Sequence, residues 1–342
     1  MLTIIDTLPI DLLDVDAHQL HEVLAGPTLI HLAGRRSPPL FVSALLHGNE
    51  DVGLKAIQQL LKDYADRELP RSLSIFIGNV EAARHGLRRL EHQPDYNRIW
   101  LDTLAGDTPE HQMVQKVKDE MRNRGVFASV DLHNNTGLNP HYACINRLDH
   151  RFFHIATLFN RTVVYFLRPD GVQSMAFAEL CPAVTLECGQ VGQLHGTKHA
   201  IDYLHACLQL SDIPTHPIAE HDIDLFHTVA VVKIPEDINF EFSAEPDSAD
   251  ICFASDIDHL NFRELPEGTM LGKVRPDCER PLDIHDENGR DVYDYFFRIF
   301  DNELQTARPI MPSMLTLNEK IIRQDCLCYL MERIPINFND SH

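Results

Sequence analysis

Hydrophobic and polar positions divide the chain into two stretches with different patterns. Up to about residue 211, short apolar runs alternate with longer amphipathic segments, which is typical of an α/β domain. The runs predict strands at Thr28–Ala33, Leu40–Leu46, Ser72–Ile77, Phe127–Leu132, Val163–Phe166 and Ala183–Leu186. Between them, apolar residues at three- and four-residue intervals predict helices at Asn49–Tyr64, Thr108–Arg122, His150–Phe159 and Lys198–Leu210.

The pattern changes after the segment Ser211–Asp224, where two prolines and isolated charges interrupt the periodicity. The apolar runs that follow are short and are separated by Pro, Gly and Asp clusters; examples are Val229–Ile234, Met270–Val274 and Ile321–Tyr329. This predicts a smaller, β-rich C-terminal domain. For a chain of 342 residues we therefore expect two domains, residues 1–215 and 222–342.

Composition narrows the class of protein. The chain has 51 acidic and 30 basic residues, a formal net charge of −21, whereas a nucleic-acid-binding protein needs a clustered basic face. We therefore expect no nucleic-acid partner. The opening residues show neither a basic segment nor a continuous apolar one, so we expect no signal peptide, no transmembrane helix and a cytoplasmic protein. The sequence leaves the oligomeric state open, a homo-oligomer included.

Two candidate metal ligands stand where a predicted strand gives way to a helix. His47 follows the run Leu40–Leu46, and Glu50 comes three residues later. In open α/β sheets ligands gather at the carboxyl ends of strands, and side chains one helical turn apart can point at the same place. Histidine nitrogen and carboxylate oxygen belong to hydrolytic zinc sites. With 20 histidines in the chain this spacing also arises by chance, so it needs support elsewhere.

His133, at the end of the predicted strand Phe127–Leu132, is the third candidate ligand. Asp131 lies two residues earlier on the same face and could orient an imidazole ligand through its other ring nitrogen. Three protein ligands leave one position for water, which is the arrangement of catalytic zinc. The expected cofactor is therefore one Zn²⁺ per subunit, with His47, Glu50 and His133 as its ligands.

Glu187 ends another predicted strand, Ala183–Leu186. A carboxylate that faces a metal-bound water can take its proton and later deliver it to the leaving nitrogen, which makes Glu187 a candidate general base. The alternative is a surface glutamate. The position that Glu187 shares with the three metal-ligand candidates, at the end of an apolar strand, favours the functional interpretation.

The segment Asn79–Trp100 is basic for so acidic a chain, which suggests an anionic ligand. Arg98 beside Asn97 could hold a substrate carboxylate through paired donors, and Arg88 could stabilise the oxyanion of a tetrahedral intermediate. The alternative is that these arginines merely neutralise neighbouring acidic residues. The arginines of the segment are Arg84, Arg88, Arg89 and Arg98.

His195 and His199, four residues apart at the start of a helix, could form a metal-binding pair. No carboxylate lies between them at a metalloprotease spacing, so we expect surface or packing roles for both.

These motifs together resemble those of the succinylglutamate desuccinylase and aspartoacylase family, a branch of the zinc carboxypeptidase clan. The resemblance covers roughly residues 28 to 210. His47-Gly48-Asn49-Glu50 matches the family's first metal motif, and Asp131-Leu132-His133-Asn134 is similar to its second. Asp95 to Trp100 looks like the segment whose Asn and Arg bind the substrate carboxylate, and Thr185 to Gly189 like the segment that carries the general base.

The resemblance implies a mixed-sheet α/β carboxypeptidase-like domain followed by a smaller β domain, and an enzyme that releases an acyl group from an amino acid by amide hydrolysis. It implies that Glu187 acts as the base, that Arg88 stabilises the oxyanion, and that Asn97 and Arg98 bind a small carboxylate-bearing substrate. Between Arg88 and Arg98 this chain has two more residues than the family commonly has, so Arg88 and Arg89 remain alternatives.

Two other functions are compatible with the sequence. One is a metallocarboxypeptidase that trims short peptides with the same zinc site and the same Arg98. The other is a binding module that holds metal without turnover, which the presence of Glu187 beside all three ligands disfavours.

Overall fold

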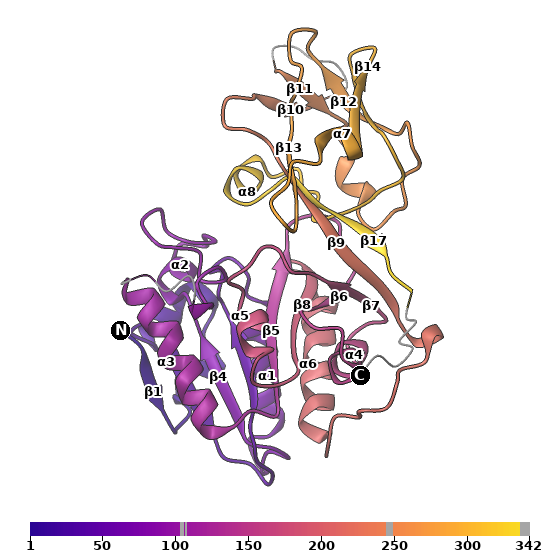
Figure 1. Cartoon of the computed structure of the whole chain (residues 1–342). Helices are drawn as coiled ribbons and strands as arrows, with labels where there is room; N and C mark the ends of the chain where they lie inside the picture. The colour runs from indigo at the N-terminus through magenta and orange to yellow at the C-terminus, as the bar shows by residue number, and fades with distance from the viewer. Residues whose placement is uncertain (103–105, 107, 244–248, 336–342) are drawn as a thin grey trace. The chain divides into compact units, whose positions relative to one another are not determined.

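The computed structural model describes residues 1–102, 106, 108–243 and 249–335 (Figure 1). Contacts between Cα atoms divide the chain into two compact units. The first unit comprises Met1–Asn134, His141–Tyr165 and Pro169–Asp224. The second comprises Asn135–Pro140, Phe166–Arg168 and the chain from Leu225 onward. The segment 211–224, which the sequence suggests as a linker, thus falls within the first unit.

The first unit is built on a mixed sheet with strands in the order β1-β2-β4-β3-β5-β8-β6-β7. β3 runs parallel to both β4 and β5, whereas β2 is antiparallel to β4 and β6 is antiparallel to β8. The mixed α/β fold expected from the sequence is confirmed. The strands are β1 (Thr3–Ile5), β2 (Thr28–Leu32), β3 (Leu40–Ala44), β4 (Leu73–Ile77), β5 (Ala128–Asn135), β6 (Tyr142–Ile145), β7 (Thr162–Tyr165) and β8 (Ala183–Gln190).

Helices of the first unit bury one apolar side each. Every residue of β3, β4 and β5 is buried, as expected for strands covered on both faces. Thr108 caps α3 by accepting a hydrogen bond from the backbone N–H of His111, as its position before a proline suggests. The helices are α1 (Val52–Asp63), α2 (Val80–Arg84), α3 (Pro109–Arg124), α4 (His150–Thr157), α5 (Gln173–Phe177) and α6 (Leu194–Gln209).

The second unit is rich in strands, as expected. β9 pairs with β13 and β17, and β17 pairs with β16, all antiparallel. A separate sheet has the order β10-β11-β12-β15-β14. The strands are β9 (Asp224–Lys233), β10 (Phe240–Phe242), β11 (Ile251–Phe253), β12 (Met270–Val274), β13 (Asp283–Asp286), β14 (Phe297–Phe300), β15 (Glu303–Thr306), β16 (Met311–Ser313) and β17 (Cys328–Arg333), with short helices α7 (Tyr293–Phe296) and α8 (Glu319–Gln324).

The observed elements differ from the predicted ones at three places where polar residues follow or interrupt an apolar run. β5 and β8 continue to Asn135 and Gln190, beyond the apolar runs that predict them, so that polar residues such as His133 and Glu187 lie within the strands. The run Ile321–Tyr329 is not one strand. Asn318 accepts a hydrogen bond from the N–H of Ile321 and caps α8, and the strand begins only at Cys328.

Among the described residues, no helix has the length and apolar character needed to span a membrane.

Candidate active site

His47 and Glu50 lie in the loop between β3 and α1, and both are buried. Nδ1 of His47 is 2.9 Å from Oε1 of Glu50. The intervening Gly48 is needed for packing, since a Cβ there would lie 2.2 Å from the backbone nitrogen of Ala83 in α2. The first turns of α2 therefore rest directly on this loop and fix where His47 and Glu50 point.

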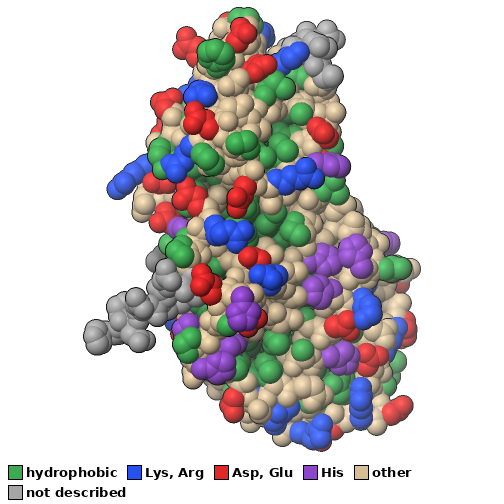
Figure 2. Space-filling model, turned by 90° about the vertical axis from the view of Figure 1, so that its right-hand side faces the viewer, with side chains coloured by type: hydrophobic (Ala, Val, Ile, Leu, Met, Phe, Trp, Pro, Cys, Tyr) green, Lys and Arg blue, Asp and Glu red, His purple; other side chains and the backbone are tan. Residues whose placement is uncertain are grey.

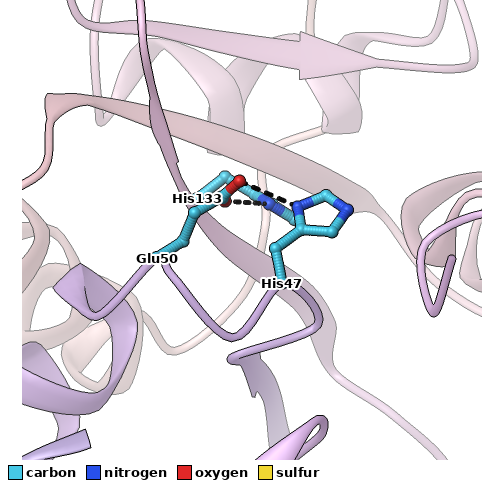
Figure 3. A group of neighbouring side chains, drawn as sticks. All are labelled: His47, Glu50 and His133. Carbon is cyan, nitrogen blue, oxygen red and sulfur yellow. Dashed lines mark hydrogen bonds and ion pairs between the residues drawn. The ribbon is translucent and has the colours of Figure 1, made fainter. Parts of the chain in front are cut away.

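His133 reaches the same carboxylate from β5. Its Nδ1 is 2.8 Å from Oε2 of Glu50, so the two imidazoles converge on the two oxygens of one glutamate (Figure 3). One ligand atom from each of the three residues lies within 4.8 Å of the others. Two imidazole nitrogens and a carboxylate oxygen are the donor set of hydrolytic zinc sites. The structure thus brings the three predicted ligands together in a group that fits a metal ion.

A carboxylate holds the other nitrogen of each imidazole. Nε2 of His47 is 3.0 Å from Oδ1 of Asp95, and Nε2 of His133 is 2.7 Å from Oδ2 of Asp131. Ser43 in β3 donates to the second oxygen of Asp131 at 2.7 Å. Such contacts fix the ring orientation and the tautomer of metal-ligating histidines. The sequence suggested this role for Asp131 but not for Asp95.

Asn134 is a second residue whose part in the site the sequence did not indicate. Its backbone N–H donates to Oε2 of Glu50, and its side-chain oxygen accepts from the N–H of Val52 in the first turn of α1. Its amide nitrogen donates to the carbonyl of Gly189 in β8. One residue therefore ties Glu50, the start of α1 and the end of β8 together, through its backbone and its side chain.

The charges of the group favour an ionised Glu50. Burial would raise the pKa of this carboxyl, but the imidazoles of His47 and His133 outweigh burial and hold the pKa well below its usual range. Burial likewise opposes a charged His133, yet Asp131 and Glu50 raise its pKa well above the ordinary value. The acidic side chains around the histidines thus provide negative charge for a cation.

Glu187, on β8 beside β5, differs from these carboxylates. It is 8% exposed, and among the described residues its Oε2 has no hydrogen-bond partner. Burial raises its pKa to about 7, and the charges of His133, Glu50 and His47 also act on it. A carboxyl that titrates near neutrality and lacks a fixed partner is suited to accept and release a proton.

The structure distinguishes the two neighbouring arginines. Nε and a terminal nitrogen of Arg88 bond to Oδ2 of Asp95 at 3.1 and 2.9 Å, and its other terminal nitrogen lies 3.7 Å from Oε1 of Glu50. Arg89 instead donates to the backbone carbonyl of Gln93. Arg88 is therefore the arginine that lies at the His47–Glu50–His133 group.

Asn97 lies at the edge of the same group. Its Oδ1 accepts from the backbone N–H of Gln173, which fixes the amide so that Nδ2 lies 3.2 Å from Nε2 of His133. Arg98 donates to the carbonyl of Asn97 and adds to the positive charge that acts on Asp95. Both residues are thus in the segment that covers the histidines.

The amino-acid sequence was also compared with protein families. Residues 36–209, about half of the chain, match the model of the succinylglutamate desuccinylase/aspartoacylase catalytic domain. The chain belongs to this family. The resemblance noted in the sequence is thereby confirmed. A search of curated proteins by sequence finds no match.

Solved structures agree with this family at the level of the fold. A succinylglutamate desuccinylase from Vibrio parahaemolyticus aligns with a TM-score of 0.60 and 14% identity over 92% of this chain and 88% of that one. Murine aminoacylase 3 aligns with a TM-score of 0.58 and 15% identity over 88% and 97%. A succinylglutamate desuccinylase from Chromobacterium violaceum gives 0.56 and 17% over 89% and 87%.

The match to the desuccinylase/aspartoacylase family includes every residue of the candidate site. His47, Glu50, His133 and Glu187, together with the segment from Arg88 to Arg98, all fall between residues 36 and 209. The second unit contributes the chain beyond the match, from residue 225 onward. The family match therefore concerns the unit that carries the candidate site.

Proposed function

We propose that the protein is a zinc-dependent hydrolase that cleaves the amide bond of an N-acyl amino acid. The observation that carries this proposal is the buried carboxyl of Glu187, whose Oε2 has no hydrogen-bond partner in the described part of the chain and which interacts electrostatically with a His-Glu-His group that fits a metal. A group with metal ligands alone would suit a binding module. A titratable carboxyl beside the metal ligands adds the proton acceptor and donor that hydrolysis needs.

His47, Glu50 and His133 would hold the ion, through Nδ1 of each imidazole and the carboxylate of Glu50. Zinc held there would polarise the scissile carbonyl and lower the pKa of a bound water. Asp95 and Asp131 keep Nδ1 of each ring directed at the site, because they accept the proton on Nε2.

Glu187 would move the proton. As a base it accepts a proton from the attacking water, and as an acid it delivers that proton to the departing amine. A pKa raised to about 7 by burial lets the same carboxyl do both near neutral pH. The succinylglutamate desuccinylases that share this fold are named for removal of an acyl group. Hydrolysis of an amide requires this transfer of a proton from water to the departing amine.

The segment from Arg88 to Arg98 would bind the substrate. We propose that Arg88, fixed by its two bonds to Asp95, stabilises the oxyanion of the tetrahedral intermediate. Nδ2 of Asn97 is within hydrogen-bond distance of Nε2 of His133, at 3.2 Å. When Nε2 carries the proton that it donates to Asp131, it cannot also accept from Asn97, and the amide hydrogens of Asn97 are left for a substrate. Asn97 can thus donate to a substrate carboxylate, and Arg98 next to it would add the charge.

A substrate panel tests the proposal. Chelator-treated protein is supplied with zinc and assayed with N-acetyl and N-succinyl amino acids, with short peptides, and with N-acyl amino acid amides that lack the free carboxylate. We expect zinc-dependent release of the amino acid from the N-acyl compounds and much weaker activity on the amides.

The alternatives give different results in the same assay. A metallocarboxypeptidase would hydrolyse the peptides in preference to the N-acyl amino acids. A binding module would take up zinc and release no product from any compound. Either result would contradict the proposed deacylase.

A further inference from the structure

Histidine side chains gather on the face of the molecule shown in Figure 2. The first unit contains three neighbouring histidines that have no part in the proposed hydrolysis. His141 immediately precedes β6, while His195 and His199 are one turn apart on α6. The ring of His141 stacks with both others, with centroid distances of 5.0 Å to His195 and 5.2 Å to His199. A ring from one segment thus lies against an i, i+4 pair on a helix.

Two nitrogens of this cluster face each other. Nδ1 of His141 and Nδ1 of His199 share a hydrogen bond of 2.9 Å, in which one ring donates and the other accepts. Two imidazole nitrogens bound to one metal at about 2.0–2.1 Å lie about 2.9 Å apart at a right angle and about 3.3 Å apart in a tetrahedral arrangement. A cation that displaces the shared proton would therefore meet two nitrogens that already lie close to the separation it needs.

The surroundings of His199 favour the same interpretation. Its ring stacks on the Phe159 ring, with centroids 4.1 Å apart. This packing holds the imidazole in one plane and keeps its Nδ1 directed at His141.

His141 is not fully satisfied by the protein. Among the described residues, its Nε2 is buried and has no hydrogen-bond partner. The described part of the chain thus bonds this ring through Nδ1 alone.

We propose that His141 and His199, joined by the exposed side chain of His195, form a second metal site for a first-row transition cation. Three imidazoles select Zn²⁺, Ni²⁺ or Cu²⁺ over Mg²⁺ and Ca²⁺, which prefer oxygen ligands. In the structure the ligand nitrogens of His141 and His199 are close together, and the His195 ring stacks on His141. His195 is exposed at the start of α6, and rotation of its side chain would bring in the third ligand.

The location of this second site connects it with Glu187. Tyr142, the residue after His141, is the partner of Glu187 in the pairing of β6 with β8. Gly189, two residues after Glu187, approaches His141 so closely that a Cβ there would lie 2.9 Å from Nε2. A cation held by the three histidines would therefore restrain the turn between β8 and α6, immediately beyond the proposed base.

Metal titration of the full-length protein tests the second site independently of activity. Metal-free protein is dialysed against increasing zinc or nickel, and bound metal is quantified. We expect the wild type to take up a second ion beyond the one at His47. The double variant His47→Ala/His133→Ala should keep one ion, and its Cu²⁺ spectrum should show imidazole nitrogen ligands.

Variants on one helix provide matched controls. His199→Ala should lose the second ion. His195→Ala, a change at an exposed side chain that removes its stack on His141, should weaken the affinity of the second ion by about tenfold or more. His205→Ala, also on α6 but bonded to Asp63, should leave metal uptake unchanged.

Several results would overturn the second site. A wild type that takes up a single ion at saturating metal would do so. So would a second ion that binds equally tightly in His195→Ala and in the wild type, because the cluster would then be only a stack of packed rings. The wild-type titration and the exposed His195 variant give an answer even if His199→Ala fails to fold.

Discussion

Asp95 lies 3.0 Å from Nε2 of His47, on the side of the ring opposite the nitrogen that faces Glu50. Arg88 donates two hydrogen bonds to the other oxygen of this carboxylate. Burial would raise the pKa of Asp95, but His47 and Arg88 hold it well below the usual range. An ionised carboxylate at this position both orients the ligand and connects it to the arginine segment.

Replacing Asp95 should therefore weaken metal binding without removing a ligand. Asp95→Asn keeps the shape of the side chain but loses the charge that holds His47 and Arg88. We expect zinc affinity to fall by about 10–100-fold, measured by competition with a chromogenic chelator. Glu91→Gln, an exposed change in the same loop, is the control and should leave affinity unchanged. Equal affinity in Asp95→Asn and wild type would show that His47 needs no such partner.

The two adjacent arginines should behave differently. Arg88→Lys loses the paired bonds to Asp95 and the planar donors aimed at the site, so kcat/KM should fall by about 10²-fold or more. Arg89→Lys alters a contact with the Gln93 carbonyl and should stay close to wild type. Both variants are compared at matched zinc content, which separates an effect on turnover from one on metal binding. A larger loss in Arg89→Lys would assign the oxyanion role to Arg89.

Glu187 should make the stability of the metal-free protein depend on pH. Burial raises its pKa from 4.5 to about 7 in the folded chain. The folded state thus keeps a proton that the unfolded state releases, and the stability present below pH 4.5 is lost as pH rises toward 7. Glu187→Gln removes this loss. Relative to wild type, the free energy of unfolding of the variant should rise by on the order of 3 kcal/mol between pH 4.5 and pH 7, at about 1.36 kcal/mol per pKa unit.

Denaturant unfolding at several pH values, with a chelator present, measures this gain. Glu68→Gln changes an exposed carboxyl and should show no such trend. A difference between Glu187→Gln and wild type that is the same at every pH would contradict a raised pKa. With zinc, the same variant should bind the metal and lose most turnover, as expected if Glu187 transfers the proton.

Gly48 should tolerate no side chain. A Cβ would overlap the backbone of Ala82 and Ala83, at 2.4 and 2.2 Å, so α2 or the ligand loop must move. We expect Gly48→Ala to lower the unfolding free energy by about 1–3 kcal/mol and to weaken zinc binding as well. Gly26→Ala, where a Cβ meets nothing within 4 Å, is the control. Wild-type metal affinity in Gly48→Ala would show that the loop does not depend on α2.

The grouping of the three candidate metal ligands could be predicted because each lies at or just beyond an apolar run that forms a strand. β3 and β5 are parallel neighbours, so His47 and His133 arrive at the same end of the sheet. The local pattern of apolar residues is enough to predict where such residues lie, because residues that follow parallel strands are placed at the same edge of the sheet. The same reasoning indicated Asp131, which shares a strand face with His133.

Contacts between loops could not be predicted in this way. Asp95 lies in a stretch without periodicity, and its distance to His47 depends on how that stretch folds back over the sheet. Asn134 uses three groups to join Glu50, Val52 and Gly189, a role that its position after His133 does not reveal. His141 and His199 are 58 positions apart, and only the folded sheet brings them together.

The separation of the ligands along the chain has a consequence for biosynthesis. His47 and Glu50 are three positions apart, but His133 is 83 positions beyond Glu50. Under the proposed zinc binding, a nascent chain that has not yet placed β5 beside β3 would offer only two ligands and would hold metal weakly. Metal capture would then follow assembly of the sheet, and the free energy of binding would add to that of the finished fold. Metal content in freshly made protein would thus report how many molecules have completed the first unit.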